Sequence, residues 1–248
     1  MHVFITGGTR GIGNGLVREF LKSGIKVSFT GTSEESVRKA SVALDGSFFG
    51  LVCDVRSYDS ILNSSIRAIE KFGNIDVWIN NAGIDQPRKT VDHIDESDIR
   101  NLIDINVTGS IHGTKVAISH FKENNCGIVY NMEGLGSNGM KIPETIIYGS
   151  SKSLITYFSE AANKELKKHK DIFVGRLQPG MVFTDLLLNG LDDEATKIAS
   201  ILGNKVETVT PYLVKGVLKN KRVVKWLTTR RIMFKFIKSI FVKTRIEM

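Results

Sequence analysis

Cysteine and proline are scarce in this chain of 248 residues. Its two cysteines, Cys53 and Cys126, lie far apart and form no CxxC pair, and it has only four prolines. This cysteine usage argues against a disulfide framework or a cysteine zinc site and favours a reducing compartment. The five histidines are scattered without the spacing of metal ligands, so we predict no metal site.

Long apolar runs are also absent. No run of 18 apolar residues occurs, and the first strand-like run begins at His2, which leaves no room for a secretory leader. We therefore expect a cytoplasmic protein that is neither exported nor membrane-spanning, with membrane association as the alternative. With 42% hydrophobic and 24% charged residues, the composition is that of an ordinary globular protein.

Acidic residues are nearly absent from the end of the chain. Residues 215–248 hold eleven Lys and Arg against one acidic residue, Glu247, so this segment carries about +10 and the remainder about −2. The net charge of +8 is therefore a property of the tail. No nucleic-acid recognition motif accompanies this charge, and we expect no nucleic-acid partner.

The hydrophobic pattern alternates between strand-like and helix-like segments. Strands are predicted at residues 3–6, 26–30, 48–53, 75–79, 127–131 and 172–177, and helices at 34–44, 57–72, 97–121 and about 148–169, with a further helical pattern through residues 16–21. This alternation predicts an α/β fold, a single Rossmann-type doubly wound parallel sheet with helices on both faces. We assign residues 1–216 to a dinucleotide-binding catalytic domain and residues 217–248 to a basic amphipathic extension of the same domain.

A glycine-rich turn follows the first predicted strand. Residues 6–13 read TGGTRGIG and lead into a helical pattern. Glycines permit a tight turn and close backbone approach, and a helix N-terminus attracts a pyrophosphate. Such a turn can simply connect a strand to a helix, but its position after the first strand favours a cofactor site. The expected cofactor-binding residues are Gly7, Thr9, Arg10, Gly11, Ile12 and Gly13.

Tyr148 and Lys152 lie four residues apart in a predicted helix and so share one face. An ammonium near a phenol favours the phenolate, and each unit by which it lowers the tyrosine pKa corresponds to ~1.4 kcal/mol. Tyr148 could then donate a proton to a carbonyl oxygen as hydride arrives from a nicotinamide, or remove one in the reverse reaction. In a Lys-rich chain the pair alone could arise by chance.

Together these motifs resemble the short-chain dehydrogenase/reductase family. The TGxxxGxG turn, Asp54, the run at 80–83, Asn106, the Tyr148/Lys152 pair, and Pro179-Gly180 with Thr184 follow in family order over residues 1–185. The resemblance implies cofactor contacts from Asp54, Val55, Asn81, Ala82, Gly83, Tyr148, Lys152, Pro179, Gly180, Val182 and Thr184.

The resemblance also implies individual roles. Asp54 and Val55 would meet the adenine, Thr184 would reach the nicotinamide amide, and Lys152 would hold the nicotinamide ribose. Asn106 would support a water near that lysine. Simpler alternatives stay open: Asp54 could cap the following helix, residues 81–83 could merely form a turn, and Asn106 could kink its helix.

The choice between NAD(H) and NADP(H) depends on the end of the second predicted strand, where a carboxylate would bind the ribose hydroxyls and repel a 2′-phosphate. Residues 30–33 read TGTS, without a carboxylate. Arg10 resembles the basic residue common in NADP-using members, although the arginine often found at the position of Thr32 is missing. We therefore favour NADP(H), with Thr32, Ser33 and Arg10 as the phosphate contacts.

The family serine that usually precedes the tyrosine by thirteen residues is replaced here by Leu135, which cannot donate a hydrogen bond. Ser137, eleven residues before Tyr148, is the expected substitute. The alternative is that Ser137 is only a loop residue and that Tyr148 alone holds the substrate oxygen. We predict a catalytic group of Asn106, Ser137, Tyr148 and Lys152.

A closer resemblance is to the chlorophyll b reductase-like subgroup, through residues 131–139, which include Ser137, residues 179–187 and the basic aromatic tail. The subgroup carries a serine at the position of Ser137. Chlorophyll is therefore one candidate substrate among others.

The tail predicts an amphipathic basic helix. An apolar stripe is formed by Met233, Phe236, Ile237, Ile240 and Phe241, and the flanking cations are Arg230, Arg231, Lys235, Lys238 and Lys243. This helix could pack on its own domain, on a partner subunit or on a membrane surface. Residues 223–227 resemble the strand that completes a tetramer in many relatives, but lack its glycines.

These observations predict an NADP(H)-dependent short-chain oxidoreductase that interconverts a carbonyl and an alcohol on a bulky apolar substrate, as a homodimer or homotetramer. Residues 186–191 could form an apolar lid over the site. The alternative is a catalytically silent dinucleotide-binding or membrane-associated scaffold, to which Leu135 and the tail point. A sugar-nucleotide epimerase is disfavoured, because only about sixty residues follow Thr184.

Overall fold

The computed structural model describes residues 1–188 and 193–241. A sheet of seven parallel strands forms its centre, in the order β3-β2-β1-β4-β5-β6-β7. The strands are β1 (His2–Ile5), β2 (Lys26–Gly31), β3 (Phe48–Val52), β4 (Val77–Asn80), β5 (Gly127–Met132), β6 (Ile172–Gln178) and β7 (Val223–Lys225). The predicted doubly wound parallel sheet is confirmed.

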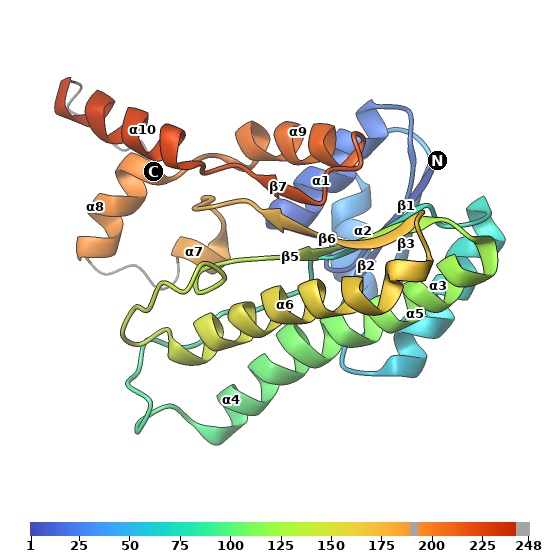
Figure 1. The fold of residues 1–248 in the computed structure, drawn as a ribbon, viewed down its shortest axis with the longest axis horizontal. Helices are drawn as coiled ribbons and strands as arrows, with labels where there is room; N and C mark the ends of the chain where they lie inside the picture. The colour runs from blue at the N-terminus through green and yellow to red at the C-terminus, as the bar shows by residue number, and fades with distance from the viewer. Residues whose placement is uncertain (189–192, 242–248) are drawn as a thin grey trace.

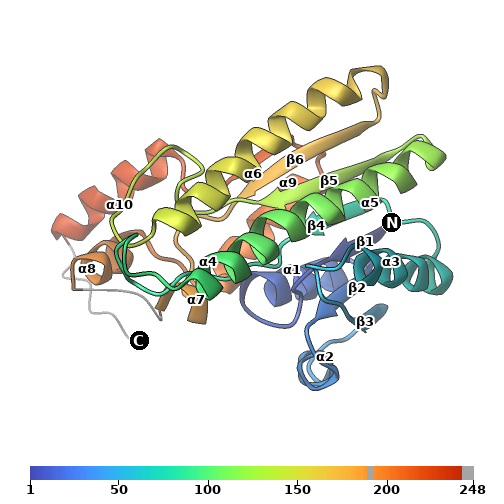
Figure 2. The ribbon, with the colours of Figure 1, turned by 90° about the horizontal axis from the view of Figure 1, so that it is seen from below.

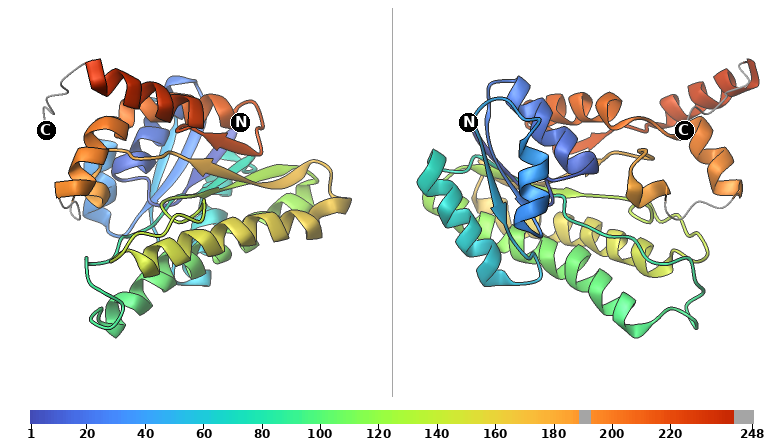
Figure 3. Two further views of the ribbon diagram at one scale, coloured as in Figure 1. Left: turned by 60° about the vertical axis from the view of Figure 1, so that its left-hand side comes forward. Right: turned by 180° about the vertical axis from the view of Figure 1, so that it is seen from behind.

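Helices cover both faces of the sheet (Figure 1). They are α1 (Gly11–Lys22), α2 (Glu34–Ser41), α3 (Tyr58–Phe72), α4 (Glu96–Ile103), α5 (Gly109–Asn124), α6 (Ile146–Glu165), α7 (Asp185–Leu188), α8 (Asp193–Leu202), α9 (Val206–Val217) and α10 (Thr229–Phe241). Figure 3 shows α1 and α9 on one side of the sheet, and α5 and α6 on the other.

Each face of the sheet has its own apolar core, because successive side chains of a strand point to opposite faces. In β1, Val3 and Ile5 join the core beneath α1 and α9, whereas Phe4 joins the core beneath α3 and α5. Strands buried on both faces read as continuous apolar runs, which is the pattern that the sequence shows.

The helix predicted at residues 97–121 is interrupted. Between α4 and α5 lies a π-helical turn, η1 (Asp104–Thr108), which contains Asn106. π-helical turns are rare and frequently occur at functional sites. The helices α8 and α9 lie between the strand predicted at residues 172–177 and the predicted basic helix of the tail, and the sequence analysis predicted neither of them. α9 packs tightly on α1, where a side chain at Gly15 would collide with Val206 and Thr210.

The sheet reverses its winding order between β1 and β4, since β1 pairs with both β2 and β4 in parallel register. Ligands of open α/β sheets bind in the crevice at the carboxyl ends of the strands beside this switch point. In the part of the chain that the structure covers, residues 1–188 and 193–241, we find no helix with the length and apolarity to cross a bilayer.

Candidate active site

A cavity of about 1530 Å³ opens at the carboxyl ends of the strands. It exceeds the ~300–1,000 Å³ of ordinary small-molecule pockets, so it has room for a dinucleotide together with a substrate. Its walls bring together nineteen of the predicted site residues, namely Gly7, Thr9, Arg10, Gly11, Ile12, Gly13, Thr32, Asp54, Val55, Asn81, Ala82, Gly83, Ser137, Tyr148, Lys152, Pro179, Gly180, Val182 and Thr184. Ser33 and Asn106 are not among the lining residues.

The glycine turn has the shape that a pyrophosphate requires. Gly7 and Gly11 adopt positive φ angles of 65° and 53°, which favour glycine. A side chain at Gly13 would overlap the Gly7 carbonyl oxygen. The N-cap residue of α1, Arg10, makes no side-chain capping hydrogen bond, so the first N–H groups of the helix face the cavity without that partner. These residues fit a bound dinucleotide phosphate.

Asn81 and Thr6 hold the turn against the end of β4. The Asn81 side-chain amide donates to the carbonyl oxygens of Thr6 (3.1 Å) and Gly7 (2.9 Å). The Thr6 hydroxyl accepts from the backbone N–H groups of Asn81 (3.0 Å) and Ala82 (3.1 Å). Residues 81 and 82 are thereby bonded to the glycine turn, and their contact with a cofactor stays a prediction.

Ser33 is used to start a helix. It is the N-cap of α2, and its hydroxyl accepts from the Ser36 backbone N–H (3.2 Å). Ser33 therefore does not line the cavity as predicted, whereas Ser36 lines it together with Thr32. The sequence could have predicted this role, because a serine at the start of a helix, three residues before another polar residue, is typical of an N-cap.

Asp54 pairs with Arg56 and caps no helix. The Arg56 guanidinium donates to the Asp54 carboxylate at 2.7 and 2.9 Å and holds the pKa of that carboxyl below its ordinary value. The N-cap of α3 is Ser57. Arg56 also lines the cavity, and the sequence analysis did not single it out.

Asn106 is buried behind the cavity wall. Its side chain donates to the Ile84 carbonyl oxygen and accepts from the Ile84 N–H, both at 2.8 Å. A methyl group at Gly83 would lie 3.2 Å from the Asn106 amide oxygen and 3.6 Å from the Lys152 ammonium nitrogen. Asn106 thus fixes the loop after β4 and lies close to Lys152. Its role toward a water stays a prediction.

Tyr148, which is half-buried, and Lys152, which is buried, both lie on α6 and line the cavity. The Lys152 ammonium nitrogen lies 5.6 Å from the centre of the Tyr148 ring and donates to the Met132 carbonyl oxygen (3.3 Å). Burial lowers the pKa of Lys152 to about 8. The pair therefore comes together as its spacing predicts.

The predicted lowering of the Tyr148 pKa is wrong for this structure. Burial raises the pKa of Tyr148, the Asp85 carboxylate raises it further, and the Arg88 guanidinium opposes both more weakly. The physical reason is that loss of hydration disfavours the phenolate more than the neighbouring charges stabilise it. The phenol therefore keeps its proton at neutral pH.

Gly134 is the residue that faces the phenol. A methyl group at Gly134 would lie 2.5 Å from the Tyr148 oxygen. The position beside the phenol oxygen therefore belongs to Gly134, and neither Leu135 nor Ser137 occupies it. The Ser137 hydroxyl accepts from the Gly134 N–H (3.2 Å) and lies 3.4 Å from the Lys152 carbonyl oxygen. It braces the loop at the cavity wall, and its contact with a substrate stays a prediction.

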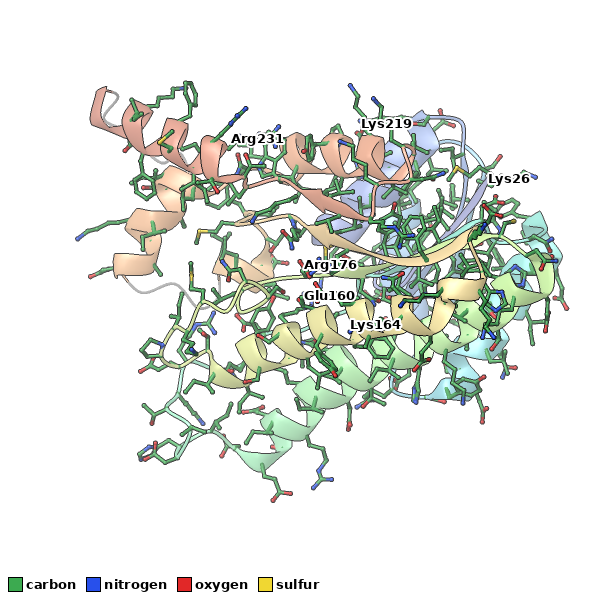
Figure 4. The ribbon with its side chains drawn as sticks, in the orientation of Figure 1. Lys26, Glu160, Lys164, Arg176, Lys219 and Arg231 are labelled. Carbon is green, nitrogen blue, oxygen red and sulfur yellow. The ribbon has the colours of Figure 1, made fainter. Side chains whose placement is uncertain are left out.

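The sequence analysis missed Glu133, which directly follows β5. This carboxylate is 3% exposed and accepts from Thr156 (2.8 Å) and Arg176 (3.2 Å). Arg176 also pairs with Glu160 at 3.0 Å, as Figure 4 shows between β6 and α6. The attraction of Glu133 opposes the lowering of the Lys152 pKa. The sequence feature that could have identified Glu133 is an acidic residue directly after an apolar, strand-like run.

The outer part of the cavity is apolar. Met140, Ile142, Leu186, Ile198, Leu202 and Ile232 contribute to its wall. Of the predicted lid at residues 186–191, Leu186 and Leu187 line the cavity and Leu188 is exposed, while residues 189–191 lie outside the described residues. At the base of α7, Asp185 pairs with Arg10 of the glycine turn at 3.9 Å.

The family sequence model described as short chain dehydrogenase matches residues 1–195. The chain belongs to this family. Among its curated relatives is "Probable chlorophyll(ide) b reductase NYC1, chloroplastic" of Arabidopsis thaliana, 32% identical over 262 residues, 96% of this chain and 53% of the relative. Another is chlorophyll(ide) b reductase NOL, chloroplastic, of Oryza sativa subsp. japonica, 33% identical over 227 residues, 87% of this chain and 66% of the relative.

The resemblance to the chlorophyll b reductase-like subgroup is thus confirmed, and the chain spans about half to two thirds of the length of these relatives. Among solved structures, serine dehydrogenase complexed with NADP+ superposes with a TM-score of 0.80 at 23% identity, covering 93% of this chain and 96% of that one. At that identity the likeness shows the fold. The short-chain dehydrogenase family consists of NAD(P)-dependent oxidoreductases.

Proposed function

We propose that this protein is an NADP(H)-dependent carbonyl reductase for a bulky apolar substrate. The observation that carries the proposal is the pair of half-buried Tyr148 and buried Lys152 in a cavity whose other end is a glycine turn shaped for a pyrophosphate. A proton donor, a cation and a dinucleotide cradle in one cavity are the parts that carbonyl reduction needs.

The protein contributes a proton and the positions of the reactants. When bound, the dinucleotide supplies the hydride. Tyr148 donates its proton to the carbonyl oxygen of the substrate, and its raised pKa keeps the phenol protonated before the reaction. The Lys152 ammonium, with a pKa of about 8, then stabilises the phenolate left behind.

A preference for NADP(H) is supported by the wall beyond β2. Thr32 and Ser36 offer hydroxyl groups there, no carboxylate stands among residues 30–33, and Arg10 lies at the rim of the same wall. Arg10 and Asp185 are both largely exposed, so their pairing at 3.9 Å is weak and leaves the guanidinium able to bind a phosphate.

A bulky apolar substrate is supported by the outer wall of the cavity and by its volume. The names of the curated relatives point to tetrapyrrole carbonyls as one candidate class.

For assembly we propose a homodimer or homotetramer. Leu154 and Tyr157, exposed apolar residues on α6, offer a surface for a second copy. We place the protein in a reducing cytoplasmic environment, in line with its two free thiols.

The test is the oxidation of NADPH in the presence of steroid, acyl, isoprenoid and tetrapyrrole carbonyls. Tyr148→Phe is expected to lower turnover by about 10²- to 10⁴-fold while retaining cofactor affinity, because it removes the proton donor and little else. Tyr58→Phe, on α3 and outside the cavity wall, is the matched control and is expected to behave as the wild type.

The result that would overturn the proposal is turnover that is equal in Tyr148→Phe and wild type. Dinucleotide binding without turnover of any carbonyl would favour the scaffold alternative instead. Calorimetric titration of the wild type with NADPH identifies the scaffold, because a scaffold binds the cofactor although it turns over no carbonyl.

A further inference from the structure

The helix α10 turns its basic side toward the protein. The Lys235 ammonium donates to the carbonyl oxygens of Ile201 (3.4 Å), Leu202 (3.3 Å) and Gly203 (3.0 Å) at the end of α8. Arg231 donates to the Trp226 carbonyl oxygen (2.7 Å) and lies over the Trp226 ring, and Figure 4 labels it at the start of the helix. Two of the predicted flanking cations therefore attach α10 to its own domain.

The apolar side of α10 faces solvent as a result. Met233 is 60% exposed, Phe234 67%, Phe236 42% and Ile237 50%. These side chains lie one, three or four residues apart, so they share a broad side of the helix opposite Lys235. Folded domains usually hide their apolar helix faces, and a contiguous exposed one marks a surface for association.

This exposed side adjoins the mouth of the cavity. Ile232, the neighbour of Met233, lines the cavity itself. Three more residues of the cavity wall, Met140, Leu186 and Ile198, are large apolar side chains that are also exposed. Figures 1 and 2 show that α7, α8 and α10 gather at the same end of the molecule.

The charge around this surface selects the kind of partner. Arg230 and Lys238 are exposed on α10, and residues 229–241 of this helix hold four cations and no acidic residue. A second copy of the chain would bring like charges together at this face, which disfavours self-association through it. An anionic partner is attracted instead. The exposed apolar residues come from four separate segments around the mouth of the cavity, which suits a deformable apolar medium better than a shaped protein.

We propose that α10 and the mouth of the cavity dock on the surface of an anionic lipid bilayer. Met233, Phe234 and Ile237 enter the boundary between headgroups and acyl chains, while Arg230 and Lys238 bind the anionic headgroups. If the proposed reductase function holds, an apolar substrate reaches Tyr148 directly from the membrane. The docking itself does not depend on that function.

The test is flotation of the 248-residue chain, without cofactor, with vesicles of phosphatidylcholine alone and with vesicles that also contain about 30 mol% phosphatidylglycerol. Wild type is expected to bind the anionic vesicles at least about tenfold more tightly than the neutral ones, with affinity falling as salt rises. Phe234→Ser/Ile237→Ser is expected to weaken that binding by about tenfold or more. Val42→Ser/Ile66→Ser removes two exposed apolar side chains elsewhere and is expected to bind as the wild type.

Two further measurements make the result decisive. Thermal unfolding checks that the α10 variant is folded, and Tyr148→Phe should bind vesicles as the wild type does, so loss of catalysis cannot be mistaken for loss of docking. The proposal is overturned if wild type ignores anionic vesicles, or if the α10 variant binds them equally. It is also overturned if sedimentation shows that this face joins two copies of the chain while vesicles are not bound.

Discussion

At the scale of the residue, the protonation of the site follows from burial. Tyr148 and Lys152 both lose hydration, and burial disfavours the charged form of each: it raises the pKa of the phenol and lowers that of the ammonium to about 8. At pH 7 the phenol is therefore protonated and Lys152 is mostly charged. As pH rises through about 8, Lys152 loses its charge first, and the stabilisation of the phenolate is lost with it.

The contact between Gly134 and Tyr148 gives a prediction at this scale. In Gly134→Ala the new methyl group would lie 2.5 Å from the phenol oxygen, so the phenol must move. We expect turnover to fall by about 10²-fold, because a proton donor displaced by about 1 Å loses its alignment, while cofactor affinity stays unchanged. Steady-state kinetics and cofactor titration measure both quantities.

The matched control for that substitution is Gly149→Ala, one residue after Tyr148 on α6. A methyl group there meets only the Gly136 Cα atom, at 3.8 Å, so wild-type kinetics are expected. If Gly134→Ala turned over substrate as fast as the wild type, the assignment of this position to the site would be wrong.

At the scale of the element, one cluster of charged and polar side chains joins β5, β6 and α6. Glu133 follows β5, Arg176 is in β6, and Thr156 and Glu160 are on α6. The cluster fixes α6, and with it Tyr148 and Lys152, against the sheet. Because Glu133 is almost fully buried, its charge has lost most of its hydration, and the ion pair with Arg176 offsets that cost.

Arg176→Met is therefore expected to lower the free energy of unfolding by about 3 kcal/mol, since it leaves a buried carboxylate without its cation. Adding Glu133→Gln should recover much of the loss, because the amide oxygen can still accept from Thr156. Urea unfolding of the two single variants and the double variant measures the coupling. Equal loss from Arg176→Met with and without Glu133→Gln would contradict a charge-based role.

The limits of sequence patterns are clear at the same scale. Apolar periodicity predicted the segment at residues 97–121 as one helix, because it reports which residues are buried and not how the backbone bonds between them. The interruption at η1 coincides with the long-range bonds between Asn106 and Ile84. Such a contact joins residues 22 positions apart and leaves no local signature.

At the scale of the whole molecule, the cavity is built from both halves of the sheet. The glycine turn follows β1, Tyr148 and Lys152 belong to α6, and Thr184 follows β6. Thr184 lies within 3.3 Å of where a methyl group at Gly11 would stand, so the two halves meet around the cofactor site. A bound dinucleotide would therefore contact both halves.

Cofactor binding is accordingly expected to stabilise the entire fold. NADPH at about 100 times its Kd should add about 2.7 kcal/mol and raise Tm by roughly 5–10 °C. NADH at the same concentration should raise Tm less, because Thr32, Ser36 and Arg10 would lack a 2′-phosphate to bind. Scanning calorimetry with each nucleotide tests this, and a larger shift with NADH would reverse the proposed preference.

The sequence by itself determined the alternating fold, the glycine turn and the pairing of Tyr148 with Lys152. Each of these depends on residues close together in the chain, where the 3.6-residue helix period and the geometry of a turn decide the outcome. Only the tertiary structure decided the high pKa of the phenol, the place of Gly134 beside it, the burial of Glu133 and the outward-facing apolar side of α10. Those properties depend on desolvation and on contacts between distant segments, which arise only when the sheet and its helices assemble.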